Sequence, residues 1–161
     1  MIGVLKIPVL IAAIGAFIIG GVFYGFSTFV MQALARLPGP EGIRAMQAIN
    51  VTVINPLFLG IFVGTALLLV GLTIAAGFNL GQPGTLHLVA GAALYLLGCF
   101  AVTMVCNVPL NNALAAIDPG SADGAAVWAR YLRDWVFWNH VRTAASLAGA
   151  VVLTFGWAQA R

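Results

Sequence analysis

The sequence predicts an all-α fold, a membrane-embedded bundle of four transmembrane helices that forms a single domain over residues 1–161. Hydrophobic residues make up 62% of the chain and charged residues only 7%, whereas about a quarter of the residues in soluble domains are charged. Asp, Glu, Lys and Arg are absent from residues 7–35, 45–117 and 143–160. Because a span needs about 20 apolar residues, the first and third runs each hold one helix and the middle run holds two.

The composition and the charge also restrict the kinds of partner that the protein can have. With 161 residues and no linker-like segment, the chain has no room for a second domain. The net charge of +3 is small and scattered, so no nucleic-acid partner is expected. The expected partner is the lipid bilayer, and we expect an integral, multi-pass protein of the bacterial inner membrane.

The first half of the chain is expected to hold two spans. Helix one covers about residues 5–36, and its apolar run is much longer than the roughly 7 to 15 residues of a secretory signal, so we interpret it as a retained span. A turn at residues 37–40 follows, and residues 41–50 form a short amphipathic approach. Helix two then runs to about Phe78.

The second half of the chain is expected to hold the other two spans. Gly, Asn and Pro in residues 77–84 predict a tight hairpin between helices two and three. Helix three covers about residues 83–117, and a loop at residues 118–121 follows. A last long segment, residues 123–159, holds helix four.

The basic residues beside the spans predict the orientation in the membrane. Loops rich in Lys and Arg stay in the cytoplasm. More basic residues flank loops one and three than flank the termini, so we expect these loops inside. The residues compared are Arg36, Arg44, Arg130 and Arg133 against Lys6 and Arg161.

Small residues recur along every predicted span. Helices in a bilayer associate through close backbone packing, which small side chains permit. They therefore predict a tight bundle, and they are also compatible with a homo-oligomer of whole bundles. The pairs are Gly21 with Gly25, Gly60 with Gly64, Gly91 with Gly98, and Ala145 with Gly149.

Polar side chains at membrane depth are informative, because their burial in lipid costs free energy unless a partner or a function compensates. They concentrate late in helix one, early in helix two, late in helix three and early in helix four. Successive spans run in opposite directions, so these four regions lie at the same bilayer surface. We therefore expect a pocket at one end of the bundle. Its expected members include Tyr24, Asn55, Asn107, Asn111, Asn139, His140 and Arg142.

Helices three and four carry the most specific patterns. Asn107 and Asn111 share a helix face, and Pro109 between them removes a backbone donor and disturbs the preceding turn. In helix four, a stripe of aromatic, amide and guanidinium groups follows the helical repeat and suits a planar ligand that carries oxygen atoms. The members of this stripe are Trp135, Trp138, Asn139 and Arg142.

Each candidate residue also has a structural interpretation. The tryptophans could form an aromatic belt at the membrane surface. Arg142 could extend outward to that surface or pair with Asp134. The asparagines could join helices by hydrogen bonds, and Asn55, which precedes Pro56, could cap a helix. His140 could be a hydrogen-bonded structural residue.

Metal and nucleotide chemistry are not indicated by the sequence. No grouping of Cys, His and carboxylate residues has the spacing of a metal site, and no phosphate loop or dinucleotide fingerprint occurs. His87 and His140 belong to opposite surfaces, so they cannot hold a haem together. No cofactor and no metal are therefore expected.

Five segments of the chain can be considered together. They are GFSTFVM at residues 25–31, AMQAIN at 45–50, NPLF at 55–58, NVPLN at 107–111 and WVFWNHVRT at 135–143. In this order they resemble the anthrone oxygenase-like family of membrane proteins, and the resemblance covers nearly the whole chain. The asparagine-proline and tryptophan-asparagine-arginine segments are its most specific marks. Many bacterial members of that family are known only as a domain of unknown function.

The resemblance implies a four-helix membrane protein, and some fungal and actinobacterial relatives oxidise polyketide anthrones to anthraquinones with O2 and no evident cofactor. An anthrone methylene is acidic because its anion is an aromatic phenolate, so a base and a cation could generate an anion that reacts with O2. By this hypothesis His140 is the base and Arg142 stabilises the oxyanion. Asn107, Asn111 and Asn139 would hold oxygen atoms, while Trp135 and Trp138 would pack against the rings.

Two other functions stay open at this point. The same pocket could hold a quinone, a lipid or another small amphiphile without turnover, which a copurified ligand would favour. The chain could also be a structural bundle that assembles with other membrane proteins. In that case the Asn and Arg positions would tolerate Ala with only a loss of stability.

Overall fold

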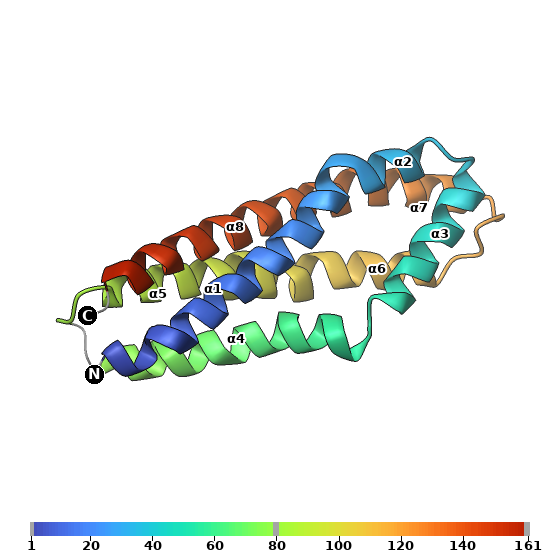
Figure 1. The fold of residues 1–161 in the computed structure, drawn as a ribbon. Helices are drawn as coiled ribbons and strands as arrows, with labels where there is room; N and C mark the ends of the chain where they lie inside the picture. Colours follow the sequence, from blue (N-terminus) through green and yellow to red (C-terminus); the bar gives the residue numbers. More distant parts are fainter. Residues whose placement is uncertain (1, 79–80, 160–161) are drawn as a thin grey trace.

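Four helical rods run along the long axis of the computed structural model, which describes residues 2–78 and 81–159 (Figure 1). The first rod consists of α1 (Ile2–Gly25), the π-helical segment η1 (Phe26–Val30) and α2 (Met31–Ala35). The second is α4 (Pro56–Gly77). The third comprises α5 (Thr85–Ala93), the π-helical segments η2 (Leu94–Ala101) and η3 (Thr103–Asn107), and α6 (Val108–Ala115). The fourth comprises α7 (Gly124–Arg130), the π-helical segment η4 (Tyr131–Trp135) and α8 (Val136–Gln159).

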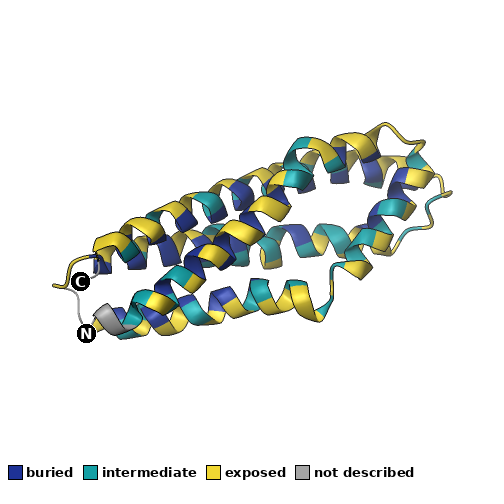
Figure 2. Cartoon of the chain, in the orientation of Figure 1, coloured by how far each residue is buried: buried dark blue, intermediate teal, exposed yellow. Residues whose placement is uncertain are grey.

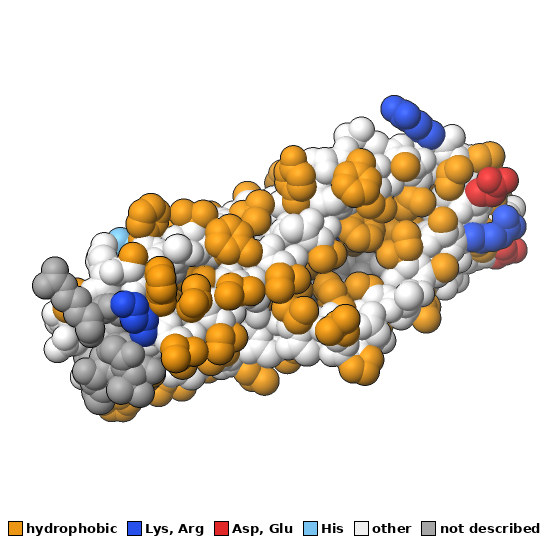
Figure 3. Space-filling view, viewed as in Figure 1, with side chains coloured by type: hydrophobic (Ala, Val, Ile, Leu, Met, Phe, Trp, Pro, Cys, Tyr) orange, Lys and Arg blue, Asp and Glu red, His pale blue; other side chains and the backbone are white. Residues whose placement is uncertain are grey.

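Each rod contains a segment that is long and apolar enough to cross a bilayer. These segments are Leu5–Ala35, Pro56–Gly77, Thr85–Ala115 and Gly124–Gln159. Charged side chains gather at the two ends of the long axis on the face shown in Figure 3, and hydrophobic side chains cover the surface between them. The protein is therefore a multi-pass membrane protein, and the prediction of an all-α bundle with four spans is confirmed.

The boundaries of the helices follow the predicted ones closely, except between the first and second spans. There the chain forms α3 (Gly39–Thr52), a 14-residue helix that runs obliquely at one end of the bundle toward the start of α4 (Figure 1). It is longer than the predicted approach, and three residues separate it from α4. Of the residues used in the predictions of the hairpin and the orientation, Asn79, Leu80 and Arg161 lie outside the described residues.

Small residues bring α8 close to the third rod. A Cβ atom on Gly149 would lie 3.0 Å from the carbonyl oxygen of Gly91, and one on Gly98 would lie 2.5 Å from Cβ of Ala145. Figure 2 shows the resulting band of buried residues between the rods. The predicted packing of these residues is confirmed. The prediction is wrong for Gly21, Gly60 and Gly64, because a Cβ atom there would meet nothing within 4 Å.

In the opposite half of the bundle, the rods are held apart by α3. Gln47 of α3 donates hydrogen bonds from Nε2 to the carbonyl oxygens of Leu114, at 2.9 Å, and Ile117, at 3.2 Å. A second apolar core forms between this helix and its neighbours, and it includes Ile43, Met46, Leu114, Trp128 and Tyr131. This arrangement fastens α3 to the end of the third rod and separates the start of α4 from η3 and η4.

Candidate functional site

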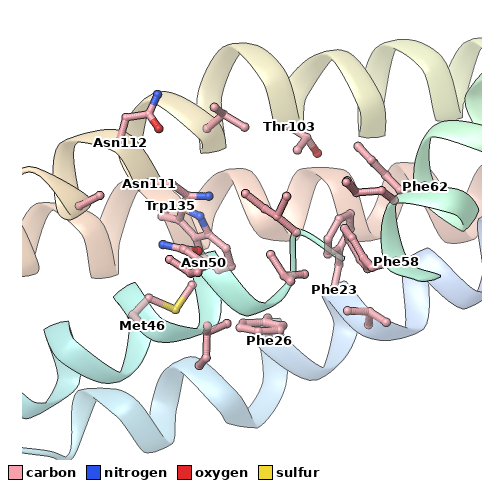
Figure 4. Close-up of a pocket in the computed structure, with 18 of the residues that line it drawn as sticks. Phe23, Phe26, Met46, Asn50, Phe58, Phe62, Thr103, Asn111, Asn112 and Trp135 are labelled. Carbon is pink, nitrogen blue, oxygen red and sulfur yellow. The ribbon is translucent and has the colours of Figure 1, made fainter. Parts of the chain in front are cut away.

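A cavity of about 650 Å³ lies in the half of the bundle that α3 holds open. Its walls come from α1, η1, α3, the start of α4, η3, α6, η4 and α8. The volume falls in the range of about 300 to 1,000 Å³ that is typical of small-molecule sites. Figure 4 shows amide side chains toward one end of the cavity and a cluster of phenylalanines beside Thr103 toward the other.

Three of the π-helical segments contribute to this cavity. Phe26 of η1, Thr103 of η3 and Trp135 of η4 all line it. A π-helical turn is wider than an α-helical turn and often occurs at functional sites. In the third rod the cause is visible, because Pro109 has no N–H and the turn before it is η3. The disturbance predicted at Pro109 is therefore present.

Arg142 of α8 is the charged residue of the cavity wall, and only 5% of its surface is exposed. Its Nε donates a hydrogen bond to Oδ1 of Asn139 at 2.9 Å. Its Nη1 donates a longer one to Oγ1 of Thr103 at 3.4 Å. The guanidinium carbon lies 3.8 Å from the ring centre of Phe23 and 4.8 Å from that of Trp135. The cation is thus fixed between two aromatic rings.

No anion compensates this buried cation in the part of the chain that the structure describes. Its nearest carboxylate in sequence, Asp134, instead accepts hydrogen bonds from Arg130 at 3.3 Å and Arg133 at 2.7 Å. Glu41, Asp118 and Asp123 are exposed. The predicted alternative of a pair between Arg142 and Asp134 is therefore wrong. Burial of an unpaired charge costs several kcal/mol, and each of the two aromatic faces returns about 2 kcal/mol of that cost.

Asn139 holds the guanidinium in place and is itself completely buried. Its Nδ2 donates hydrogen bonds to the carbonyl oxygen of Phe23 at 2.9 Å and to Oγ of Ser27 at 2.7 Å. These bonds fix the amide so that its oxygen faces Arg142. The Nη2 atom of Arg142 has no acceptor within the described residues, so the guanidinium keeps a donor for a ligand.

The other end of the cavity is lined by neutral amides. Asn111 accepts a hydrogen bond at Oδ1 from the hydroxyl of Tyr131 at 2.8 Å, and Nδ2 of Asn50 lies 3.4 Å from the same hydroxyl. Tyr131 is stacked between Trp128 and Trp135, with ring centres 5.7 and 5.5 Å away. The Oδ1 atom of Asn111 is taken by Tyr131, whereas its Nδ2 makes no hydrogen bond within the described residues and stays available as a donor.

Asn107 lies behind the cavity wall and is completely buried. Its Nδ2 donates a hydrogen bond to the carbonyl oxygen of Trp135 at 3.1 Å, which ties η3 to η4. Its Oδ1 and the Nε1 of Trp135 have no hydrogen-bond partner among the described residues. Asn107 therefore joins two helices, as its structural interpretation suggested.

Phenylalanine side chains cover the region around the guanidinium. The rings of Phe58 and Phe62 are stacked with centres 5.8 Å apart, and both rings meet Phe23 edge-on. Phe26 meets Trp135 edge-on at 5.8 Å. Such a wall suits the faces and edges of flat aromatic rings.

The structure places His140 outside the cavity, on the exposed surface of α8. Successive residues of an α-helix are about 100° apart around the axis, so residues 140 and 142 lie about 200° apart, on opposite faces. The expectation that His140 faces the pocket is therefore wrong. No histidine or carboxylate lines the cavity within the described ranges.

Five other predicted members of the pocket do not line it, and two of these are the completely buried Asn107 and Asn139 described above. Tyr24 is 55% exposed, because its neighbour Phe23 takes the inward position. Trp138 is half-buried at the edge of the stripe and packs edge-on against Phe137 at 5.1 Å. Asn55 caps α4, where its Oδ1 accepts hydrogen bonds from the backbone N–H groups of residues 57 and 58 at 3.1 and 3.0 Å.

The predicted residues that the structure does bring together are Trp135, Asn139, Arg142 and Asn111, with Asn107 directly behind them. Sequence reasoning missed Phe23, Phe58 and Phe62, since a phenylalanine that faces a cavity has no pattern that separates it from one that faces lipid. Asn50 and Thr103 belong to the polar stretches that the sequence places at this membrane surface, early in helix two and late in helix three, but no pattern singles them out. Within the described residues, no group of three His, Cys, Asp or Glu side chains could hold a metal ion.

Comparisons with known proteins agree with the resemblance noted in the sequence. The profile of one protein family, described as anthrone oxygenase, matches residues 50–152. This match covers more than half of the chain and includes Asn50, Thr103, Asn111, Trp135 and Arg142. No curated protein and no solved structure matches the chain.

Proposed function

This chain belongs to the anthrone oxygenase family, and on that premise we propose that it oxidises a planar phenolic, polyketide-like substrate with O2 inside the cavity. In this reaction a methylene carbon of the substrate loses two hydrogen atoms and gains one oxygen atom. The second atom of O2 leaves with the two hydrogens as water. Atoms and electrons therefore balance without a further reductant.

The buried Arg142 is the observation that carries this proposal. A guanidinium stays charged in proteins, and this one lies in the cavity wall with no carboxylate partner in the described part of the chain. An anionic ligand supplies the missing charge. The anion of an anthrone is an aromatic phenolate, so it offers both a negative oxygen for Arg142 and a flat ring system for Phe23 and Trp135.

Electrostatic stabilisation replaces a side-chain base in this scheme. The described lining contains no histidine or carboxylate, so the proton of the substrate passes to water while Arg142 stabilises the oxyanion. Preorganised donors in a site of low dielectric constant are often the largest contribution to catalysis. Asn139 and Thr103 keep the guanidinium oriented. The electron-rich anion then reacts with O2 among the phenylalanine rings.

The amide end of the cavity serves binding rather than chemistry. Asn50, Asn111 and Asn112 line it, and their neutral donors and acceptors suit hydroxyl or carbonyl groups at the far side of a polycyclic substrate. Thr103 and Asn111 are eight residues apart on one helical rod, which corresponds to about 12 Å. A ligand with several fused rings spans that distance better than a single ring does.

Oxygen uptake tests the proposal. We expect purified protein to consume O2 with a dihydroxyanthrone faster than the uncatalysed reaction. The variant Arg142→Gln should lose about a hundredfold to a thousandfold in kcat, because it removes an oxyanion donor. The exposed Arg133 of the same rod gives the control Arg133→Gln, which should keep the wild-type rate. Uptake no faster than in buffer contradicts the enzyme function for this substrate.

A second candidate function is ligand binding without turnover, in which the cavity holds a quinone, a lipid or another small amphiphile. The absence of an acid or base in its described lining favours this function. Binding of a dihydroxyanthraquinone without any O2 uptake on the corresponding anthrone would select it.

The proposal also covers the location and the partners of the protein. The protein resides in the bacterial inner membrane as a single domain, with the lipid bilayer and a hydrophobic small molecule as its partners. Whether copies of the chain associate stays a prediction, for which the outward positions of Gly60 and Gly64 leave room.

A further inference from the structure

The cavity reaches the side of the bundle, where large apolar side chains that line it are also exposed. Val22 of α1 and Leu59 of α4 are each 37% exposed, and Met104 of η3 is 49% exposed. Val51 and Ile54, beside the break between α3 and α4, are exposed still further. We name these five residues the lateral mouth. Figure 3 shows a hollow in one face of the molecule with hydrophobic side chains around it.

The lateral mouth lies near one boundary of the hydrocarbon region. The 22 residues of α4 correspond to about 33 Å at a rise of about 1.5 Å per residue, close to the hydrocarbon thickness of about 30 Å. Pro56 therefore lies at one boundary of the hydrocarbon, and Leu59 is only about 5 Å deeper. Amphiphilic molecules rest at this boundary between acyl chains and headgroups.

The route from water is more obstructed. The end of the cavity that faces the membrane surface is covered by α3, which the two hydrogen bonds of Gln47 fasten to the third rod. Exposed lining residues at that end are Asn112 and Ala115. They are small or polar, whereas the five side chains of the lateral mouth are all large and apolar.

We propose that a planar amphiphile dissolved in the bilayer enters the cavity sideways, through the lateral mouth. The neutral form of a phenol dissolves in hydrocarbon far better than its anion, and an apolar rim admits that neutral form. Ionisation then takes place inside, beside Arg142. The choice of ligand rests on the proposed function, but the route does not depend on turnover.

Binding rates test the route. The probe is a dihydroxyanthraquinone, whose binding to protein in lipid nanodiscs is followed by stopped-flow absorbance without any reaction. In Leu59→Trp a larger side chain fills the mouth, so association and dissociation rates should both fall, about tenfold, with a smaller change in Kd. The control is Leu67→Trp, at a lipid-facing position of α4 that is 68% exposed and does not line the cavity. It should bind at wild-type rates.

A second pair of variants tests the route in case Leu59→Trp does not fold. Ile54→Trp alters the mouth at another position, and Ile74→Trp is its control on α4, where residue 74 is 61% exposed. Ala115→Trp narrows the other end of the cavity. Unchanged rates in both mouth variants, together with slow binding in Ala115→Trp, would overturn lateral access. If the mouth variants slow binding as expected but the protein shows no O2 uptake, only the enzyme function would be contradicted.

Discussion

The two halves of the bundle use the same four rods in different ways. In the closed half, Gly91 and Gly149 let the third and fourth rods meet backbone to backbone, with a carbonyl oxygen 3.0 Å from the place of a Cβ atom. In the open half, α3 and three π-helical segments contribute to the wall of a cavity of about 650 Å³. The same four rods therefore pack closely at one end of the bundle and surround a cavity at the other.

The polar groups of the two halves differ in the same way. In the closed half, Ser146 donates a hydrogen bond to the carbonyl oxygen of Ala16 at 2.8 Å, and Thr154 donates one to that of Ala150 at 2.9 Å. These groups have their partners within the bundle and serve structure. In the open half, the described residues offer Arg142 amide and hydroxyl partners but no anion. The lack of a compensating anion beside Arg142 distinguishes a candidate binding site from polar residues that only join helices.

The largest expected effect comes from a substitution in the closed half. Gly149→Leu should lower the free energy of unfolding by about 3 kcal/mol, because overpacking at a rigid backbone contact forces the helices apart. Thermal unfolding in detergent measures it. Gly71→Leu is the control, since a Cβ atom there meets nothing within 4 Å. Equal melting temperatures for the two variants would show that the contact between α5 and α8 does not hold the bundle together.

The next largest effect comes from a substitution in the open half. Asn139→Asp places a carboxylate 2.9 Å from Nε of Arg142, where it competes with an anionic ligand. The affinity for a dihydroxyanthraquinone should fall by about 2 kcal/mol, roughly thirtyfold, since like charges repel. The neutral dimethyl ether of the same quinone should lose much less. Titration of absorbance measures both, and an equal loss for the two ligands would reduce Asn139 to a packing role.

The smallest effect concerns His140. Because its side chain is exposed and faces away from the cavity, His140→Ala should change kcat and ligand affinity by less than about twofold, within the usual range for surface substitutions. Oxygen uptake with a dihydroxyanthrone measures the rate. A loss of tenfold or more would restore the hypothesis of a histidine base.

Much of the fold could be predicted from the sequence, because the charged residues mark the ends of the spans. The convergence of Asn111, Asn139 and Arg142 followed from antiparallel crossing alone. Asn55 had two interpretations, and the structure selects the cap. What the sequence did not reveal was α3 as a separate helix that fastens to the third rod, since that depends on the hydrogen bonds of Gln47 to distant carbonyl oxygens.

The errors in the site have physical reasons. His140 was chosen for its chemistry, although its spacing from Arg142 already places it on the other face of α8. Trp138 lies at the edge of a stripe whose centre is Trp135, Asn139 and Arg142. The π-helical segments interrupt the helical repeat of the first, third and fourth rods, so Tyr24 and Phe23 could not be told apart by periodicity in the first rod. The phenylalanine wall depends on such rotations and carries no sequence signal.

The ionisation of a bound dye tests the central claim most directly, namely that Arg142 holds an anionic ligand in the cavity. The visible absorption of a dihydroxyanthraquinone bound to the protein is recorded against pH for the wild type and for Arg142→Gln. A cation nearby favours the phenolate, so the pKa of the bound dye should be lower in the wild type than in the variant by about 1 to 3 units. A bound dye that ionises at the same pH in both proteins would contradict the claim.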